Sequence, residues 1–301
     1  MNIKQKLFKG SSAMMIFSGL VVAGMVSAAL LTMYVSMTGT TNVKQSVVFG
    51  NDDTEKTYKI SGTDDSIAGN TYIANYNLKN RSETTAPIQI TSDSPEGITT
   101  TYWSTVDLKQ KHSTDWTINE NGTNAKLTYR LNSSMFNYEL EAVGLTASTQ
   151  YSLIYYADKQ DRMNDWGGDN PGAEIVSFTS DETGNGNVLG SVNLGMNLPA
   201  VDDWNGTSEA NYCTSDNYLL CRGAKVWLVP TSDYDASTKK LTVWNPDSYL
   251  FETGLITYND TDASNGLNLG TGTLNFFVKH ELDIALEPGD YNITTSVNPV
   301  Q

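Results

Sequence analysis

The feature that most constrains this chain is a stretch of alternating residues near its N-terminus, ALLTMYVSMTGTTNVKQSVVF at residues 29–49. Apolar side chains occupy every second position of its first half, in a row made of Leu31, Met33, Val35 and Met37. An alternation of period two places one row of side chains on a single face of a β-strand. A strand with such a row needs a groove in which to bury it, either in its own chain or in another copy.

A basic start and an apolar run precede this stretch. MNIKQKLFKG carries three lysines, the apolar centre extends from Met14 to Val26, and small residues at Val26 and Ala28 fit cleavage after Ala28. These features predict a secretory signal peptide over residues 1–28 and an extracellular protein at the cell surface. The chain then begins with its alternating strand, at residues 29–42.

Two other interpretations of the N-terminus stay open. The apolar run continues to Met37, which makes about 24 residues and is long enough for an uncut membrane anchor. Lys9-Gly10 before a hydrophobic run resembles the processing site of archaeal class III signal peptides, found on pilins and archaellins. Cleavage after Gly10 would retain the hydrophobic segment as a helix in a filament core.

Charge and composition narrow the class of protein. The formal net charge is −15, and removal of residues 1–28 with their three lysines takes it to −18. Such a chain repels nucleic acid and acidic membrane surfaces, so we expect no nucleic-acid partner and membrane contact only through the N-terminal segment before processing. Aromatic residues make up 10% of the chain, which is enough for a core, and β-branched residues are frequent.

Short strand patterns between turn-forming residues continue along the whole chain, without an amphipathic helix. We therefore predict an all-β fold, a jelly-roll or immunoglobulin-like β-sandwich into which a second β-rich module is inserted. The sandwich is predicted over residues 43–134 plus 259–301, and the inserted module over residues 135–258.

Two β-hairpins are predicted from turn sequences between alternating strands. The first joins Ile175–Thr179 to Val188–Leu198 through SDETGNGN. The second closes the chain, with LNFFVKHEL at 274–282 and YNITTSV at 291–297 on either side of EPGD.

Three segments together resemble one family: ALLTMYVSMTGTTNVKQSVVF at 29–49, YNLKNRSETTAPIQI at 76–90 and FVKHELDIALEPGDYNITTSV at 277–297. They resemble the TasA/camelysin-like secreted proteins and the related archaeal bundling pilins. The resemblance covers the two ends of the chain and implies a jelly-roll-like sandwich in a surface filament, where each subunit gives its N-terminal strand to the next. The partner is then another copy of the chain, and the assembly residues are Leu31, Met33, Val35 and Met37.

We expect no enzymatic activity. The peptidase label of camelysin is not carried over, because the sequence lacks a metalloprotease motif of the HExxH kind, and GxSxG, P-loop and GxGxxG motifs are also missing. The two histidines, His112 and His280, are far apart, and His280 lies in the apolar row of a strand, which favours a hydrogen-bonded core position. No catalytic residue is therefore predicted.

Three kinds of site remain as predictions. Cys213 and Cys221 are eight positions apart and would form a disulfide outside the cytoplasm, with two buried thiols as the alternative. Calcium is the one cofactor considered, because Asp260, Asp262 and Ser264 have the alternating oxygen spacing of a calcium loop; solvated turns are the alternative. Six glycosylation sequons begin at Asn80, Asn121, Asn132, Asn205, Asn259 and Asn292, a number that chance alone explains.

A second hypothesis for the function is recognition of surface glycans by the inserted module. Its tryptophans are Trp166, Trp204, Trp227 and Trp244, and aromatic faces stack on sugars. Trp166 and Trp204 lie in polar loops, so they are the better candidates for contact with a ligand.

Overall fold

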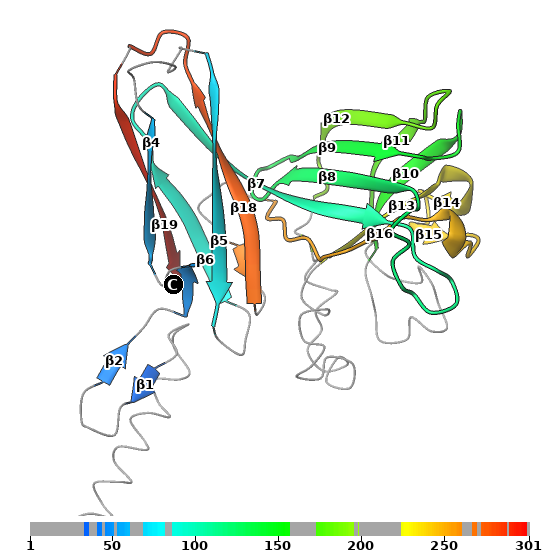
Figure 1. The fold of residues 1–301 in the computed structure, drawn as a ribbon, viewed down its shortest axis with the longest axis horizontal. Helices are drawn as coiled ribbons and strands as arrows, with labels where there is room; N and C mark the ends of the chain where they lie inside the picture. The colour runs from blue at the N-terminus through cyan, green and yellow to red at the C-terminus, as the bar shows by residue number, and fades with distance from the viewer. Residues whose placement is uncertain are drawn as a thin grey trace, which may run out of the picture. The chain divides into compact units, whose positions relative to one another are not determined.

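The chain divides into two compact units, residues 1–46 with residue 301, and residues 47–300. The computed structural model describes residues 33–35, 41–43, 46–50, 53–60, 69–81, 86–156, 173–195, 198, 224–260, 267–269, 272–287 and 289–299. In the first unit, β1 (Met33–Val35) pairs with β2 (Thr41–Val43) in a two-stranded antiparallel sheet, with Met33 opposite Val43 (Figure 1).

The second unit is built from antiparallel sheets, the largest of which has eight strands. Seven of them follow the spatial order β12–β9–β8–β7–β18–β5–β3, and β16 pairs with β7. The strands are β3 (Val47–Phe49), β5 (Thr71–Asn80), β7 (Ile98–Lys109), β8 (Asn124–Arg130), β9 (Phe136–Val143), β12 (Gly186–Val192), β16 (Phe251–Glu252) and β18 (Gly272–Leu282).

Two smaller sheets face the large one. The four-stranded sheet has the order β17–β6–β19–β4, and the three-stranded sheet has the order β11–β10–β13. Their strands are β4 (Glu55–Ile60), β6 (Ala86–Asp93), β10 (Gln150–Tyr156), β11 (Ala173–Thr179), β13 (Lys225–Pro230), β17 (Leu267–Leu269) and β19 (Tyr291–Pro299). The described residues also form a short hairpin, β14 (Tyr234–Asp235) and β15 (Lys240–Leu241), and two 3-10 turns, η4 (Thr231–Asp233) and η5 (Pro246–Ser248).

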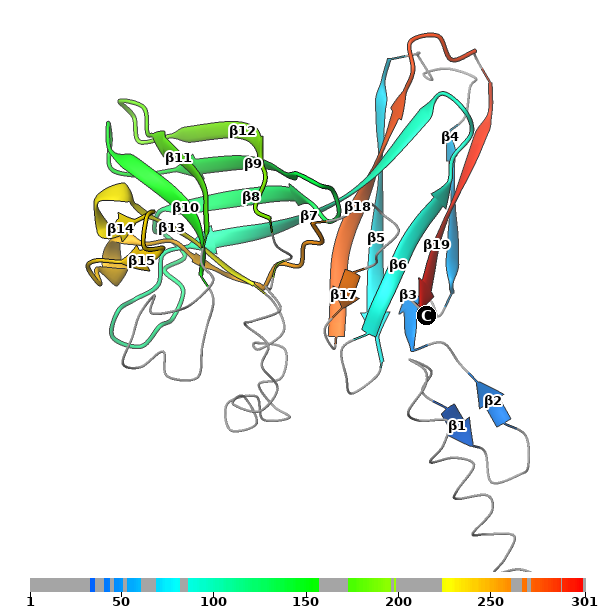
Figure 2. The same ribbon diagram turned by 180° about the vertical axis from the view of Figure 1, so that it is seen from behind.

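These sheets confirm the predicted all-β sandwich fold, and they form two sandwiches that share one strand. In the first sandwich, the β17–β6–β19–β4 sheet packs against β3, β5, β18 and the start of β7. In the second, the β11–β10–β13 sheet packs against β8, β9, β12, β16 and the end of β7. The strand β7 pairs with β18 over residues 98–103 and with β8 over residues 103–109 (Figures 1 and 2).

Each sandwich has its own apolar core. One core cluster of the first sandwich joins four strands through Ile60, Ile98, Leu282 and Ile293. In the second sandwich, a cluster from both sheets and the adjoining turns contains Ile154, Trp227, Val229, Tyr234, Tyr249 and Phe251. Alternation explains both cores, because every second residue of a half-buried strand faces the opposite sheet.

The border predicted between residues 134 and 135 falls between two paired strands. Residues 124–129 of β8 pair with residues 138–143 of β9, so the structure keeps both strands in the second sandwich. The second sandwich therefore includes the end of β7 and all of β8, which the sequence interpretation had assigned to the first.

Both predicted hairpins are wrong. β11 pairs with β10 while β12 pairs with β9, and β18 pairs with β5 and β7 while β19 pairs with β4 and β6. In each case the turn carries the chain from one layer of a sandwich to the other. The strands meet across the core through their side chains, and their backbone hydrogen bonds go to other strands.

Over the residues that the structure describes, no helix has the length and apolar character needed to cross a membrane.

His280 lies in the core of the first sandwich, in agreement with its position in an apolar row. It is fully buried, its Nδ1 shares a 3.0 Å hydrogen bond with Thr100 Oγ1, and its ring stacks on Tyr58 with centroids 5.4 Å apart. Its Nε2 is buried and has no hydrogen-bond partner among the described residues. Burial disfavours the imidazolium and lowers the pKa of His280 from 6.5 to about 4.

This burial predicts a loss of stability on acidification. Between about pH 6.5 and pH 4 the unfolded chain binds a proton at residue 280 that the folded chain excludes, so the free energy of unfolding should fall as the pH falls, by at most about 3 kcal/mol. Urea denaturation across this range measures the effect. His280→Leu should remove this pH dependence, because it removes the titrating imidazole. Thr100 Oγ1 keeps a hydrogen bond with Ser94 Oγ, 2.6 Å away, so the substitution leaves no buried hydroxyl without a partner there. The exposed His112 provides the matched control, His112→Leu, which should keep it. An unchanged pH dependence in His280→Leu would contradict the assignment.

Candidate functional site

The first sandwich has an open edge along β5. One side of β5 pairs with β18 along its whole length, from Thr71 to Asn80. On the other side, β3 pairs with Leu78–Asn80, and the backbone N–H of Gly50 donates to the Asn77 carbonyl at 3.0 Å. Within the described ranges no strand pairs with the remaining six residues of this edge, which span about 20 Å.

The register of β3 determines which part of the edge is covered. Val47 lies opposite Asn80 and Phe49 opposite Leu78, so the chain enters along β5 from its C-terminal end (Figure 2). The chain then reaches Gly50 and continues to β4, in the other sheet. The open part of β5 is thus the part that β3 would cover if it were longer.

A groove of about 430 Å³ lies beside this open edge. It is lined by Ile73–Asn77 of β5, by Lys56–Tyr58 of β4, and by Phe49 of β3 and the following residue, Gly50. β4 is itself an edge strand, paired with β19 on one side. The groove therefore lies where the two layers of the first sandwich end.

Aromatic packing fixes the inner wall of the groove. The Tyr76 ring packs 5.6 Å from Phe49 and 5.5 Å from Phe276 between centroids, and the Tyr76 hydroxyl is hydrogen bonded to Thr295 of the opposite sheet. Burial raises the pKa of the Tyr76 phenol, so this hydroxyl stays protonated. Ala74 is buried beside Tyr76 and its small side chain leaves the recess open, while Ile73 is 52% exposed on the rim.

This arrangement can accept another strand. An edge strand presents backbone donors and acceptors, and an adjoining apolar recess takes every second side chain of an added strand. At the opposite edge of the eight-stranded sheet, aromatic side chains lie against β12: a Cβ at Gly186 would lie 2.3 Å from the Phe178 ring, and a Cβ at Gly190 would lie 2.6 Å from the Tyr138 hydroxyl. Aromatic side chains thus already fill the interior at β12.

The predicted assembly residues lie in the N-terminal unit. Met33 and Val35 are in β1, whose backbone pairs with β2, and Leu31 and Met37 lie outside the described residues.

The predicted glycosylation acceptors divide into two groups. Asn80, Asn132 and Asn259 are at most 8% exposed, and the Asn80 amide donates to the Leu269 carbonyl at 3.2 Å. Asn121 and Asn292 are exposed. Asn205 lies outside the described residues.

Several other predicted sites also fall outside the described residues. These are the disulfide of Cys213 and Cys221, the tryptophans Trp166 and Trp204, and the calcium ligands Asp262 and Ser264. The remaining calcium candidate, Asp260, accepts a 3.1 Å hydrogen bond from the Tyr258 hydroxyl. The part of the chain with described coordinates contains no group of three or more His, Cys, Asp or Glu side chains arranged to hold a metal ion. The calcium site and the disulfide stay predictions.

Sequence reasoning missed both the groove and one exposed tryptophan, Trp116. The groove depends on how far β3 extends along β5, which no local pattern specifies. Trp116 stands in the polar loop KHSTDWTINENG, and the criterion that selected Trp166 and Trp204 also applies to it.

Comparison with protein-family models gave no match, and comparison with curated protein sequences gave none either.

The open edge makes a prediction for hydrogen exchange of the unassembled chain. About half of the β5 amides from residue 71 to 76 should exchange quickly, because an edge strand directs alternate N–H groups away from its single neighbour. Residues 277–281 of β18 pair with β5 on one side and β7 on the other and should stay protected. Deuterium uptake by mass spectrometry of peptides from the two strands makes the comparison. Equal protection of both would mean that another segment covers the edge.

Proposed function

We propose that this chain is an exported structural subunit of the cell surface that assembles into filaments by β-strand donation. The strand at residues 29–42 of one copy occupies the open edge of β5 and the adjoining groove in the next copy. Leu31, Met33, Val35 and Met37 enter the groove, and the backbones pair. The resemblance of both chain ends to TasA/camelysin-like proteins and archaeal bundling pilins supports the same mode of assembly.

The observation that carries the proposal is a match of length and character between donor and acceptor. The apolar row from Leu31 to Met37 covers seven residues, about 23 Å in an extended strand, which is close to the uncovered length of β5, about 20 Å. Residues 29–42 carry no charge, so the strand can enter an apolar recess without desolvating an ion. The small Ala74 at the base of the groove leaves room for a methionine or leucine side chain.

The direction of the chain supports donation to another copy. The chain enters β3 at the Asn80 end of β5, and the open part lies beyond Phe49 at the other end. The preceding residues would have to reverse direction to cover that part themselves. A strand from another copy has no such constraint.

The pairing of the donor stretch also favours its release. β1 and β2 form a sheet of two strands with three residues each, and isolated hairpins are at most marginally stable in water. Burial of four apolar side chains stabilises the assembled form by about 1.5–3 kcal/mol for each fully buried side chain, which offsets the entropy lost on association.

A mixing experiment tests the donor and acceptor roles separately. A chain lacking residues 29–41 keeps the groove and loses the strand, whereas Ala74→Phe keeps the strand and fills the groove. Neither variant should polymerise alone, and an equimolar mixture should form a dimer with one copy of each, measured by size-exclusion chromatography with light scattering. Polymers of normal length from the deletion variant would disprove strand donation.

Controls separate loss of folding from loss of assembly. Leu189→Lys alters an exposed side chain on the β12 edge, 77% accessible, and should polymerise normally. The β18 peptides of Ala74→Phe should keep their protection in hydrogen exchange. If Leu189→Lys alone stopped polymerisation, assembly would proceed through the second sandwich.

Salt dependence gives an independent prediction. Copies with a formal charge of −15, or −18 without residues 1–28, repel each other, while the proposed contact itself is uncharged on the donor side. Polymerisation should therefore be faster at about 300 mM than at about 10 mM sodium chloride, because the Debye length shortens from about 30 Å to less than 10 Å. Light scattering at equal protein concentration measures the rate. A slower rate at high salt would indicate a contact formed by opposite charges.

A further inference from the structure

A pair of exposed tryptophans marks the second sandwich. Trp116 comes from the loop between β7 and β8 and is 47% exposed, and Trp244 follows β15 and is 38% exposed. Their ring centroids are 5.8 Å apart, with an angle of 34° between the planes. The two loops also expose Ile118 and Val243. We call the two tryptophan rings the aromatic platform.

The two tryptophan rings of the platform pack against buried aromatic rings of the core. Trp116 meets Phe251 edge to face at 5.5 Å, and Trp244 meets Tyr249 edge to face at 5.7 Å. Phe251 and Tyr249 belong to the core cluster of this sandwich and are at most 2% exposed. The platform is therefore fixed to the core.

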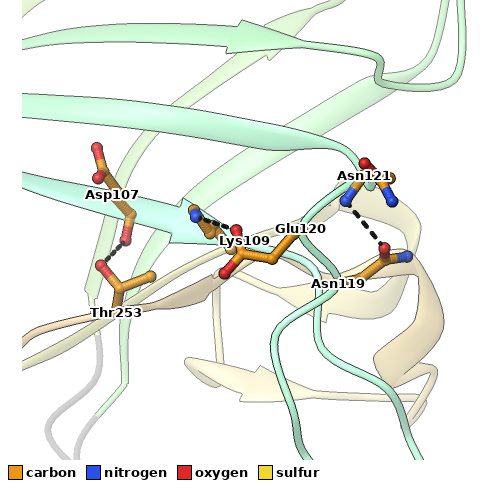
Figure 3. Close-up of polar contacts among 6 residues, drawn as sticks. All are labelled: Asp107, Lys109, Asn119, Glu120, Asn121 and Thr253. Atoms are coloured by element: carbon orange, nitrogen blue, oxygen red, sulfur yellow. Dashed lines mark hydrogen bonds and ion pairs between the residues drawn. The ribbon is translucent and has the colours of Figure 1, made fainter.

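Hydrogen bonds hold the two loops. The Gln110 amide donates to the Asp247 carbonyl, which links the Trp116 loop to η5, shortly after Trp244. At the base of the Trp116 loop, the Lys109 ammonium pairs with Glu120 at 2.7 Å, and the Thr253 hydroxyl donates to the Asp107 carbonyl at 2.9 Å (Figure 3). These contacts arrange the platform in advance of any ligand, which lowers the entropy lost on binding.

The backbone of Trp116 is strained. Its φ of 60° lies in the left-handed region, which a bulky residue rarely adopts. The Asp115 carboxylate accepts hydrogen bonds from both the backbone N–H and the hydroxyl of Thr117, and the His112 carbonyl accepts one from the Trp116 N–H at 2.8 Å. A glycine or asparagine would fit this turn with less strain. A large, half-exposed ring thus stands on a strained backbone, and such strain is typical of functional positions.

Charge around the platform favours a neutral ligand. The Lys111 ammonium lies 5.7 Å from the Phe251 ring centroid, so a cation already occupies the aromatic cluster. Exposed Asp115 and Asp247, together with the acidic chain, disfavour an anion. The flanking side chains of Thr117 and Asn245 are exposed and polar. The Thr117 hydroxyl, which donates its proton to Asp115, can accept a hydrogen bond, and the Asn245 amide, which donates one N–H to Ser248, can still donate the other and accept.

The size of the platform favours a small ligand. A standard protein interface involves about 20–30 residues on each side, with aromatic residues at its buried centre. Here the exposed apolar surface consists of two indole rings and two aliphatic side chains. A pyranose ring matches it, since its C–H face meets the negative face of an indole and its hydroxyl groups reach the polar rim.

We propose that Trp116 and Trp244 form a binding platform for neutral carbohydrate, with one or two sugar rings stacked on the indoles and hydroxyl groups bound at the rim. This site is independent of the strand-donation site, because none of its residues lines the groove of the first sandwich.

The test uses the full chain and an array of neutral oligosaccharides built from glucose, galactose, mannose or N-acetylglucosamine, followed by calorimetric titration of the strongest binder. Trp116→Ala and Trp244→Ala should each weaken the association constant about tenfold or more, as for other stacked aromatic contacts. Trp116→Tyr should retain most of the affinity. Leu189→Ala removes a more exposed apolar side chain, on β12, and should leave affinity unchanged.

Thermal unfolding separates binding from structure. Trp116→Gly should melt at a higher temperature than Trp116→Ala, because glycine tolerates the positive φ, and both should lose affinity to the same extent. Absence of binding to every neutral oligosaccharide would overturn the proposal, as would binding that survives both tryptophan substitutions. Self-association that Trp116→Ala weakens, without glycan binding, would also overturn it and assign the platform to a contact between copies.

Discussion

The backbone ladder of β7 is the constraint on which both sandwiches depend. This strand has 12 residues, about twice the usual length, and its N-terminal half pairs with β18 while its C-terminal half pairs with β8. The pairing partner of β7 changes at Trp103, which lies opposite Phe277 of β18 on one side and Arg130 of β8 on the other. On this strand the even-numbered side chains from residue 102 to 108 are all buried: Tyr102, Ser104, Val106 and Leu108. The same alternation of buried and exposed side chains therefore continues from the first core into the second. A break in this ladder would remove a central strand from both sandwiches.

The shared strand also explains why the first sandwich ends as it does. Its part of the large sheet runs from β7 through β18 to β5 and then to β3, which has three residues. The facing sheet ends at β4, beyond β19. Within the described part of the sandwich, no strand therefore pairs with one side of the last long strand of each layer along most of its length, and the half-buried Tyr76 and Tyr58 lie between these two strands. A sandwich of this kind is stable because its centre is filled by Ile60, Ile98, Leu282 and Ile293, while its margin keeps a recess.

Alternation in the sequence predicted the all-β class and most strands of this fold, because every second residue faces a core. It could not predict strand partners. The apolar rows of residues 274–282 and 291–297 are the same whether the two strands pair in one sheet or face each other across a core, since both arrangements bury the same side chains. The structure has the second arrangement, so the EPGD turn connects two layers. The predicted border between the two β modules, at residue 135, differs from the structure because the alternating pattern of β8 is compatible with either sandwich.

The two candidate sites differ in how much of them the sequence contains. The donor strand is entirely local, and its row of four apolar side chains is visible without any structure. Its proposed acceptor is formed by residues 49–50, 56–58 and 73–77 and exists only because β5 and β4 are the last long strands of their respective layers. The aromatic platform is intermediate: Trp116 in a polar loop is a visible signal, but its contact with Trp244 and Phe251 joins positions more than 120 residues apart.

Both candidate sites meet the same electrostatic limit. A chain with a charge of −15 cannot rely on attraction between charges to bind copies of itself or the acidic surfaces of cells. Backbone pairing with an uncharged strand and stacking of neutral rings on tryptophan avoid that repulsion, because neither requires a net charge of opposite sign. In both proposals the negative charge disfavours non-specific contact between copies, and specificity comes from shape and hydrogen bonding at the β5 edge and at the aromatic platform.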